Sequence, residues 1–81
     1  MAMLPDLSVL VVDDDEAIRE LLELYLAEKG YEVVVRSSAP EGLEALRIGA
    51  FDLVLSDIRM AEMDGFEFLR IVRSRYPGIG I

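Results

Sequence analysis

Two short apolar runs, each ending on aspartate, constrain the fold of this chain more than any other feature of its sequence. The first is Ser8–Val12, followed by the acidic run Asp13–Asp15, and the second lies within Phe51–Ser56, carries Leu53, Val54 and Leu55, and is followed by Asp57. Apolar runs of this length without alternation are typical of strands covered on both faces. Two buried strands that direct carboxylates to one edge of a sheet are unfavourable without a positive charge, so we expect a cation there.

The composition narrows the class of protein and the kind of metal. The chain has 81 residues, of which 53% are hydrophobic, which predicts one small domain or part of one. Its formal charge of −8 argues against nucleic-acid binding by this segment. We see no membrane-spanning run and no signal peptide, and we therefore expect a cytoplasmic protein. Without cysteine or histidine, any metal is predicted to be a hard cation with oxygen ligands, Mg²⁺ first.

Strand and helix patterns alternate along the chain. The valine-rich segment Tyr31–Arg36 predicts the second strand, helices are predicted after each of the three strands, and Gly78–Ile81 predicts the start of a fourth strand. This order indicates an α/β fold, with a parallel sheet and helices on both faces. Because Glu32 and Arg36 frame the second strand with charge, we place it at the sheet edge, which gives the strand order 2-1-3.

The helical patterns predict which side chains each helix buries. In the first helix, Arg19 is predicted to lie on the polar side. The apolar stripe opposite it consists of Ile18, Leu21, Leu22, Tyr25 and Leu26. Ser38 and Glu41 have the spacing of a capping box at the start of the second helix. In the third helix, Phe68 and Ile71 widen the apolar face beyond what one sheet needs, which indicates a further packing partner.

The predicted topology brings the acidic groups together. In an open parallel sheet, ligands bind at the carboxyl ends of the strands where the winding reverses, and here those ends carry Asp13, Asp14 and Asp57. Close carboxylates repel by roughly 4 kcal/mol per pair at an effective dielectric constant near 20. Either one retains a proton or a divalent cation neutralises them. A carboxylate beside such a metal can attack a phosphoryl group and form an acyl phosphate.

The segments Val9–Glu16 and Leu53–Met60, with Met63-Asp64-Gly65 beyond them, resemble the receiver domain of bacterial two-component response regulators. The resemblance implies a flavodoxin-like sheet with the strand order 2-1-3-4-5. It also implies that Asp57 is the phospho-acceptor and that the phosphoryl group comes from a histidine kinase or phosphotransfer protein. Such a domain is a signalling module that reacts with phospho-donors, not an enzyme with a substrate of its own.

The same resemblance implies the metal ligands. Asp14, with Asp13 in support, and Asp57 would bind Mg²⁺, and the backbone carbonyl of Arg59 would complete the protein ligands. Two features depart from the family pattern. Ala61-Glu62 stands where the family usually has proline and a small residue. The family also continues for two strands and two helices that supply a Thr or Ser and a Lys.

The 81 residues contain no threonine, and the single lysine, Lys29, is expected at the opposite edge of the sheet. Residues 1–81 are therefore interpreted as a partial receiver domain that lacks the last two strands and helices, with phosphorylation impaired. The third strand, Phe51–Ser56, is predicted to have an unpaired edge that pairs with a second copy in a homodimer.

Two alternatives remain open at this point. Asp13-x-Asp15 after an apolar strand resembles the nucleophile motif of haloacid-dehalogenase-type phosphatases, but this reading leaves Asp57 unexplained. The other alternative is an inert interaction or oligomerisation fragment with a vestigial acidic pocket.

Overall fold

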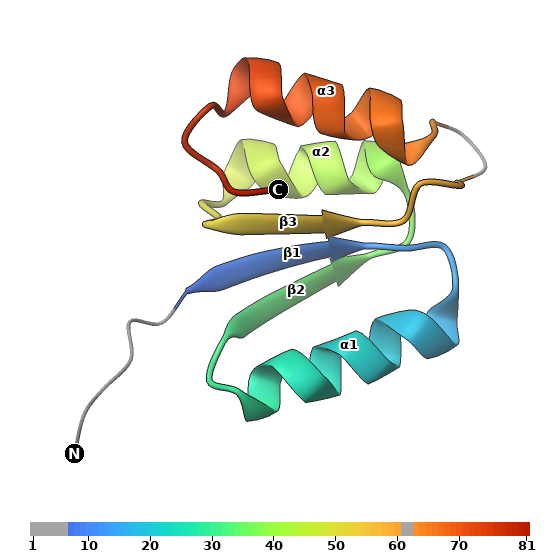
Figure 1. The fold of residues 1–81 in the computed structure, drawn as a ribbon, viewed down its shortest axis with the longest axis vertical. Helices are drawn as coiled ribbons and strands as arrows, with labels where there is room; N and C mark the ends of the chain where they lie inside the picture. The colour runs from blue at the N-terminus through green and yellow to red at the C-terminus, as the bar shows by residue number, and fades with distance from the viewer. Residues whose placement is uncertain (1–6, 61–62) are drawn as a thin grey trace.

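Strands and helices alternate in the structure, a computed structural model that describes residues 7–60 and 63–81. The elements are β1 (Ser8–Val12), α1 (Glu16–Glu28), β2 (Glu32–Arg36), α2 (Ala39–Ile48), β3 (Leu53–Ser56) and α3 (Gly65–Arg75). The strands form one parallel sheet in the order β2-β1-β3. Helix α1 covers one face of the sheet, and α2 and α3 cover the other (Figure 1). The predicted α/β fold and strand order are confirmed.

The end of the described chain pairs with the outer side of β3 through a single bridge. The Gly80 amide donates to the Asp52 carbonyl, and the Val54 amide donates to the Gly80 carbonyl, both at 2.9 Å. Leu53 and Gly80 thus form a parallel bridge. The prediction that the outer edge of β3 is unpaired is therefore wrong, because Gly80 near the end of the chain pairs with the first residues of this strand. Ser56 follows Val54 by two residues, so its backbone N–H and C=O also point away from β1, beyond the last of these hydrogen bonds.

The main core lies between the sheet and helices α2 and α3. Its fully buried members are Leu10, Val12, Ala39, Ala45, Leu46, Val54, Phe68 and Val72. Phe68 has no exposed surface, and its ring lies so close to Gly42 that a Cβ there would be 3.1 Å from it. The prediction that Phe68 needs a partner outside the chain is therefore wrong, since α2 supplies the contact, whereas Ile71 beside it is only half-buried.

Helix α1 contacts the sheet through a narrower stripe than its sequence predicts. The half-buried residues of this helix are Arg19, Leu22 and Leu26, at helical spacing. Leu21 and Tyr25, which were predicted to face the core, are 62% and 54% exposed. Leu24 on the same helix is 73% exposed. The prediction that Arg19 lies on the polar side is wrong, because it belongs to the stripe that faces the sheet.

The helix ends follow the local chemistry of the sequence. The Asp15 carboxylate caps α1 by accepting from the Ala17 and Ile18 amides, as N-cap aspartates do. Ser38 caps α2 by accepting from the Glu41 amide at 3.3 Å. The Glu41 carboxylate accepts from the amide and hydroxyl of Ser37, one residue before the position that a capping box predicts. Within the described ranges, no helix is both long and apolar enough to cross a membrane.

Candidate functional site

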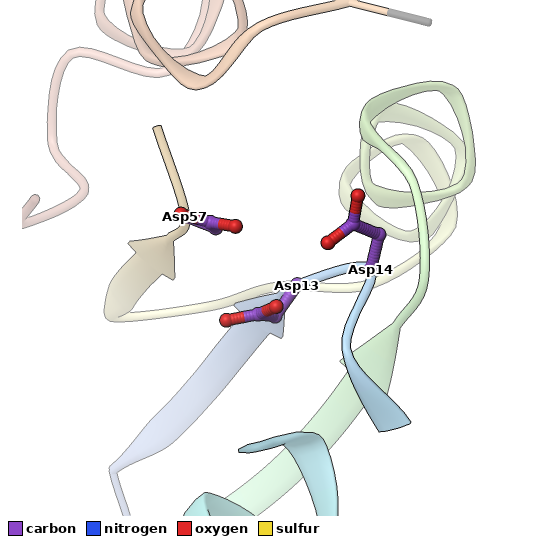
Figure 2. A group of neighbouring side chains, drawn as sticks. All are labelled: Asp13, Asp14 and Asp57. Atoms are coloured by element: carbon purple, nitrogen blue, oxygen red, sulfur yellow. The ribbon is translucent and has the colours of Figure 1, made fainter. Parts of the chain in front are cut away.

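Three aspartates meet where β1 and β3 end. Val12 and Ser56 are partners in the register of these neighbouring strands, so the residues that follow them reach the same edge of the sheet. The Asp57 amide donates to the Val12 carbonyl at 2.9 Å. Side-chain oxygens of Asp13, Asp14 and Asp57 all lie within 4.8 Å of one another, and Figure 2 shows the three carboxylates around a common space. The cluster predicted from the strand ends is present.

Hydrogen bonds orient two of these carboxylates. Asp13 Oδ1 accepts from the Asp15 amide at 2.9 Å, and Asp57 Oδ1 accepts from the Arg59 amide at 3.3 Å. Each carboxylate therefore keeps its second oxygen for another partner. Asp14 is exposed, whereas Asp13 and Asp57 are partly shielded.

The electrostatics of the cluster suit a hard divalent cation. Two unit charges 4.8 Å apart repel by about 3.5 kcal/mol at an effective dielectric constant of 20. Carboxylate oxygens at this spacing are ligands that Mg²⁺ and Ca²⁺ prefer, and Mg²⁺ needs few protein ligands because it keeps several waters. The donor set thus fits the predicted metal. The Arg59 amide lies beside Asp57, and its carbonyl stays a predicted ligand. Ala61 and Glu62, the residues that depart from the family pattern, lie outside the described residues.

The start of α3 abuts the backbone that carries Asp57. The Gly65 amide donates to the Ile58 carbonyl at 2.7 Å, and a Cβ on Gly65 would lie 2.0 Å from the Asp57 carbonyl oxygen. Asp64 caps the helix by accepting from the Glu67 amide at 2.9 Å. From sequence, Asp64-Gly65 is predicted to form a turn that closes the loop before a helix starting at about Gly65. The structure uses the pair as a helix cap and as a close contact that holds the loop after β3.

The cluster opens onto two grooves. One groove is lined by Val11, Val12, Asp13, Leu22, Leu55, Ser56 and Asp57. The other is lined by Asp14, Ile58, Arg59, Met60, Asp64 and Phe66. Lys29 is the C-cap of α1. It lies where α1 ends, near the amino-terminal ends of the strands and opposite the aspartates (Figure 1). A donor molecule can therefore reach the aspartates from solvent, and Lys29 does not reach them.

Sequence reasoning missed two residues around the cluster. Gly65 lies against the Asp57 backbone. A glycine directly after the N-cap aspartate could have indicated this close contact, but the same two residues are also typical of a turn. Arg19 donates from its guanidinium to the Asp13 carbonyl, and helical periodicity alone gave no signal for this contact.

Comparison with known proteins identifies the family. The profile of the response regulator receiver domain matches residues 9–81. The chain is 42% identical over 73 residues to the transcriptional regulatory protein GlrR of Escherichia coli K12, covering 90% of this chain and 16% of GlrR. The curated relatives are thus far longer than the matched region.

Solved receivers have the same fold. The chemotaxis response regulator CheY4 of Vibrio cholerae superposes with a TM-score of 0.84 at 37% identity, covering 88% of this chain and 59% of CheY4. The response regulator TrrA of Thermotoga maritima, solved in complex with Mg²⁺ and BeF, gives 0.84 at 38% identity, covering 86% of this chain and 61% of TrrA. The family profile, the relatives and the acidic cluster agree, and the chain belongs to the response regulator receiver family.

Proposed function

We propose that Asp57 accepts a phosphoryl group from a phosphohistidine of a histidine kinase or phosphotransfer protein, as the receiver of a two-component phosphorelay. The observation that carries the proposal is the meeting of three carboxylates within 4.8 Å in a chain of this family. Asp13, Asp14, Asp57 and the Arg59 carbonyl would hold Mg²⁺. The complex of TrrA with Mg²⁺ and BeF supports this assignment by analogy.

The residues divide the chemistry between them. Asp57 attacks phosphorus through the oxygen that does not accept from the Arg59 amide. A bond forms between this oxygen and phosphorus as the phosphorus–nitrogen bond to the donor histidine breaks, and the electron pair leaves with the imidazole. The product is an aspartyl phosphate. Mg²⁺ held by these carboxylates would supply positive charge that offsets the negative charge of the phosphoryl oxygens. Asp13 and Asp14 contribute the negative charge that binds the metal at this position.

Phosphorylation by a small donor tests the proposal. The chain is incubated with acetyl phosphate and Mg²⁺, and the intact mass is measured over time. We expect a single phosphoryl adduct, whose formation EDTA in the reaction prevents and which is absent in Asp57→Asn. Asp64→Asn is the matched control, because it removes one carboxylate charge nearby while asparagine still caps α3. Equal adduct formation in Asp57→Asn and the parent chain would contradict the assignment.

We expect the adduct to form slowly and incompletely. The 81 residues contain no threonine, and the only lysine, Lys29, lies at the far edge of the sheet. Loss of one preorganised contact to a transferring group typically costs about 3–4 kcal/mol in the transition state. A rapid, near-complete and stable adduct would show that this chain does not depend on such contacts.

The exposed face of α1 favours a second role, self-association. Leu21, Leu24 and Tyr25 are all more than half exposed on one helix, and apolar clusters of this kind mark interaction surfaces. We propose that this face joins two copies in a homodimer. Sedimentation at micromolar concentration should give a dimer mass that Leu24→Glu lowers to a monomer. Ile48→Glu is the control, because Ile48 is 68% exposed at the end of α2 on the other face. A folded monomer of the parent chain would refute this role.

A further inference from the structure

The guanidinium of Arg19 spans from α1 to the loop that carries the acidic cluster. Its Nη1 donates to the backbone carbonyl of Asp13 at 2.8 Å, in a partly buried bond. The backbone amide of the same residue donates to the Asp15 carbonyl at 3.0 Å. Arg19 therefore bonds to the residues on both sides of Asp14, the most exposed member of the cluster.

Other contacts fix the rest of this loop. The Asp13 amide donates to the Arg36 carbonyl of β2 at 3.1 Å. Asp13 Oδ1 accepts from the Asp15 amide, and the Asp15 carboxylate caps α1. In this set, Arg19 is the side chain that ties the Asp13 carbonyl to the helix. Its bond and the cap tie both ends of the segment Asp13–Asp15 to α1.

The choice of partner by Arg19 is informative. In the described part of the chain, Arg47 and Arg70 each pair with the glutamate three residues earlier, Glu44 and Glu67. Arg19 also has a glutamate three residues earlier, Glu16, yet its guanidinium is directed to the loop. The position of Arg19 on the helix explains this difference. Arg19 lies on the side of α1 that faces the sheet, with Leu22 and Leu26, so its side chain is directed toward the end of β1 and away from Glu16.

We propose that Arg19 is a positioning residue that preorganises Asp13 and Asp14 for divalent-cation binding. This inference rests on the proposed function, because it assumes that the cluster binds Mg²⁺. Charge and position have opposite effects on that binding. The positive charge of Arg19 repels Mg²⁺, so its loss through charge alone would tighten binding. Loss of a contact that orients the ligands weakens binding, as removal of partners behind metal ligands does elsewhere.

The sign of the change in Mg²⁺ affinity therefore tests the proposal. We expect Arg19→Met to weaken Mg²⁺ binding by about tenfold, the low end of the range for residues that support metal ligands. Arg19→Lys keeps the charge and a donor and should recover most of the affinity. Arg70→Met is the matched control, because it makes the same change in net charge at an exposed pair on α3. We expect this control to bind Mg²⁺ as the parent chain does or slightly more tightly.

Amide exchange in the metal-free protein gives a second, independent readout. The Asp15 amide is bonded to Asp13 Oδ1, so it should exchange faster in Arg19→Met, while core amides such as that of Val54 are unchanged. Mg²⁺ affinity in Arg19→Met equal to or tighter than in Arg70→Met would overturn the inference, as would unchanged exchange at Asp15. If Arg19→Met does not fold, Arg19→Lys and Arg19→Gln are compared instead. The inference is overturned if Arg19→Lys does not bind Mg²⁺ more tightly than Arg19→Gln. Failure of the parent chain to bind Mg²⁺ refutes the proposed function instead, and the exchange experiment still decides whether Arg19 holds the loop.

Discussion

Replacement of Gly65 by alanine should disturb the acidic site and the fold together. A Cβ at this position would lie 2.0 Å from the Asp57 carbonyl oxygen, 2.6 Å from Ile58 Cα and 2.8 Å from the Asp57 carbonyl carbon. All three neighbours are backbone atoms, so no side chain can rotate away. Ordinary contact begins near 3.4 Å, and the start of α3 and the loop after β3 must therefore separate by more than 1 Å, roughly the size of one bond.

The magnitude follows from two losses. Overpacking of this kind destabilises by about 1–3 kcal/mol, and the bond from the Gly65 amide to the Ile58 carbonyl contributes about 0.5–1.5 kcal/mol. The sum is about 1.5–4.5 kcal/mol, against a total of about 4–12 kcal/mol for a domain of this size. The melting temperature should fall by at least about 6 °C. Mg²⁺ binding should weaken as well, because the displaced backbone carries Asp57.

Urea unfolding followed by circular dichroism measures the stability change, and Mg²⁺ titration of the folded variant measures the effect on the site. Gly78→Ala is the control, because a Cβ on Gly78 meets nothing within 4 Å and its backbone has no positive φ. We expect this control to change stability by less than about 0.5 kcal/mol. Parent-like stability and Mg²⁺ affinity in Gly65→Ala would refute the close contact.

Three further changes test the local structure by urea unfolding. Asp15→Ala removes the cap of α1 and should destabilise by about 1 kcal/mol; no loss would contradict the cap. Gly30→Ala places a side chain at φ +97° and should destabilise by about 1 kcal/mol; a gain in stability would contradict that backbone conformation. The hydrogen bond from Arg47 lowers the pKa of Glu44 from 4.5. The stabilising contribution of Glu44 is therefore present above that pH and lost as pH falls through the folded pKa. The difference between the parent chain and Glu44→Gln should shrink between pH 7 and pH 3, and a constant difference would contradict this pairing.

The strand order and the acidic cluster could be predicted because both depend on patterns that are local in the sequence. Glu32 and Arg36 frame β2 with charge, which placed that strand at the edge of the sheet. Asp13 and Asp57 directly follow buried strands, and parallel strands that are neighbours end at the same edge. A prediction of this type needs no knowledge of side-chain conformations, since the backbone direction of two strands is sufficient.

The errors concern contacts between segments far apart in the sequence. Phe68 was predicted to need an external partner because the helical pattern shows only how wide an apolar face is. Whether α2 is close enough to cover that face depends on Gly42, which has no side chain to keep α3 away. The pairing of Gly80 with β3 was only partly foreseen for a similar reason. The pattern predicted a short extended segment but not which backbone groups it would reach.

Arg19 shows why the residues that support a site are harder to predict than the residues that form it. Periodicity places a Cα on a helix face, but an arginine side chain is long enough to reach a carbonyl beyond the helix end. At the start of α1, that reach joins the stripe facing the sheet to the Asp13 carbonyl, and a shorter polar residue at the same position would remain at the helix surface. The acidic residues can be read from the strand ends because their backbone positions determine their location. The residues that orient them depend on rotamers and on the path of the loop, and only the three-dimensional structure contains that information.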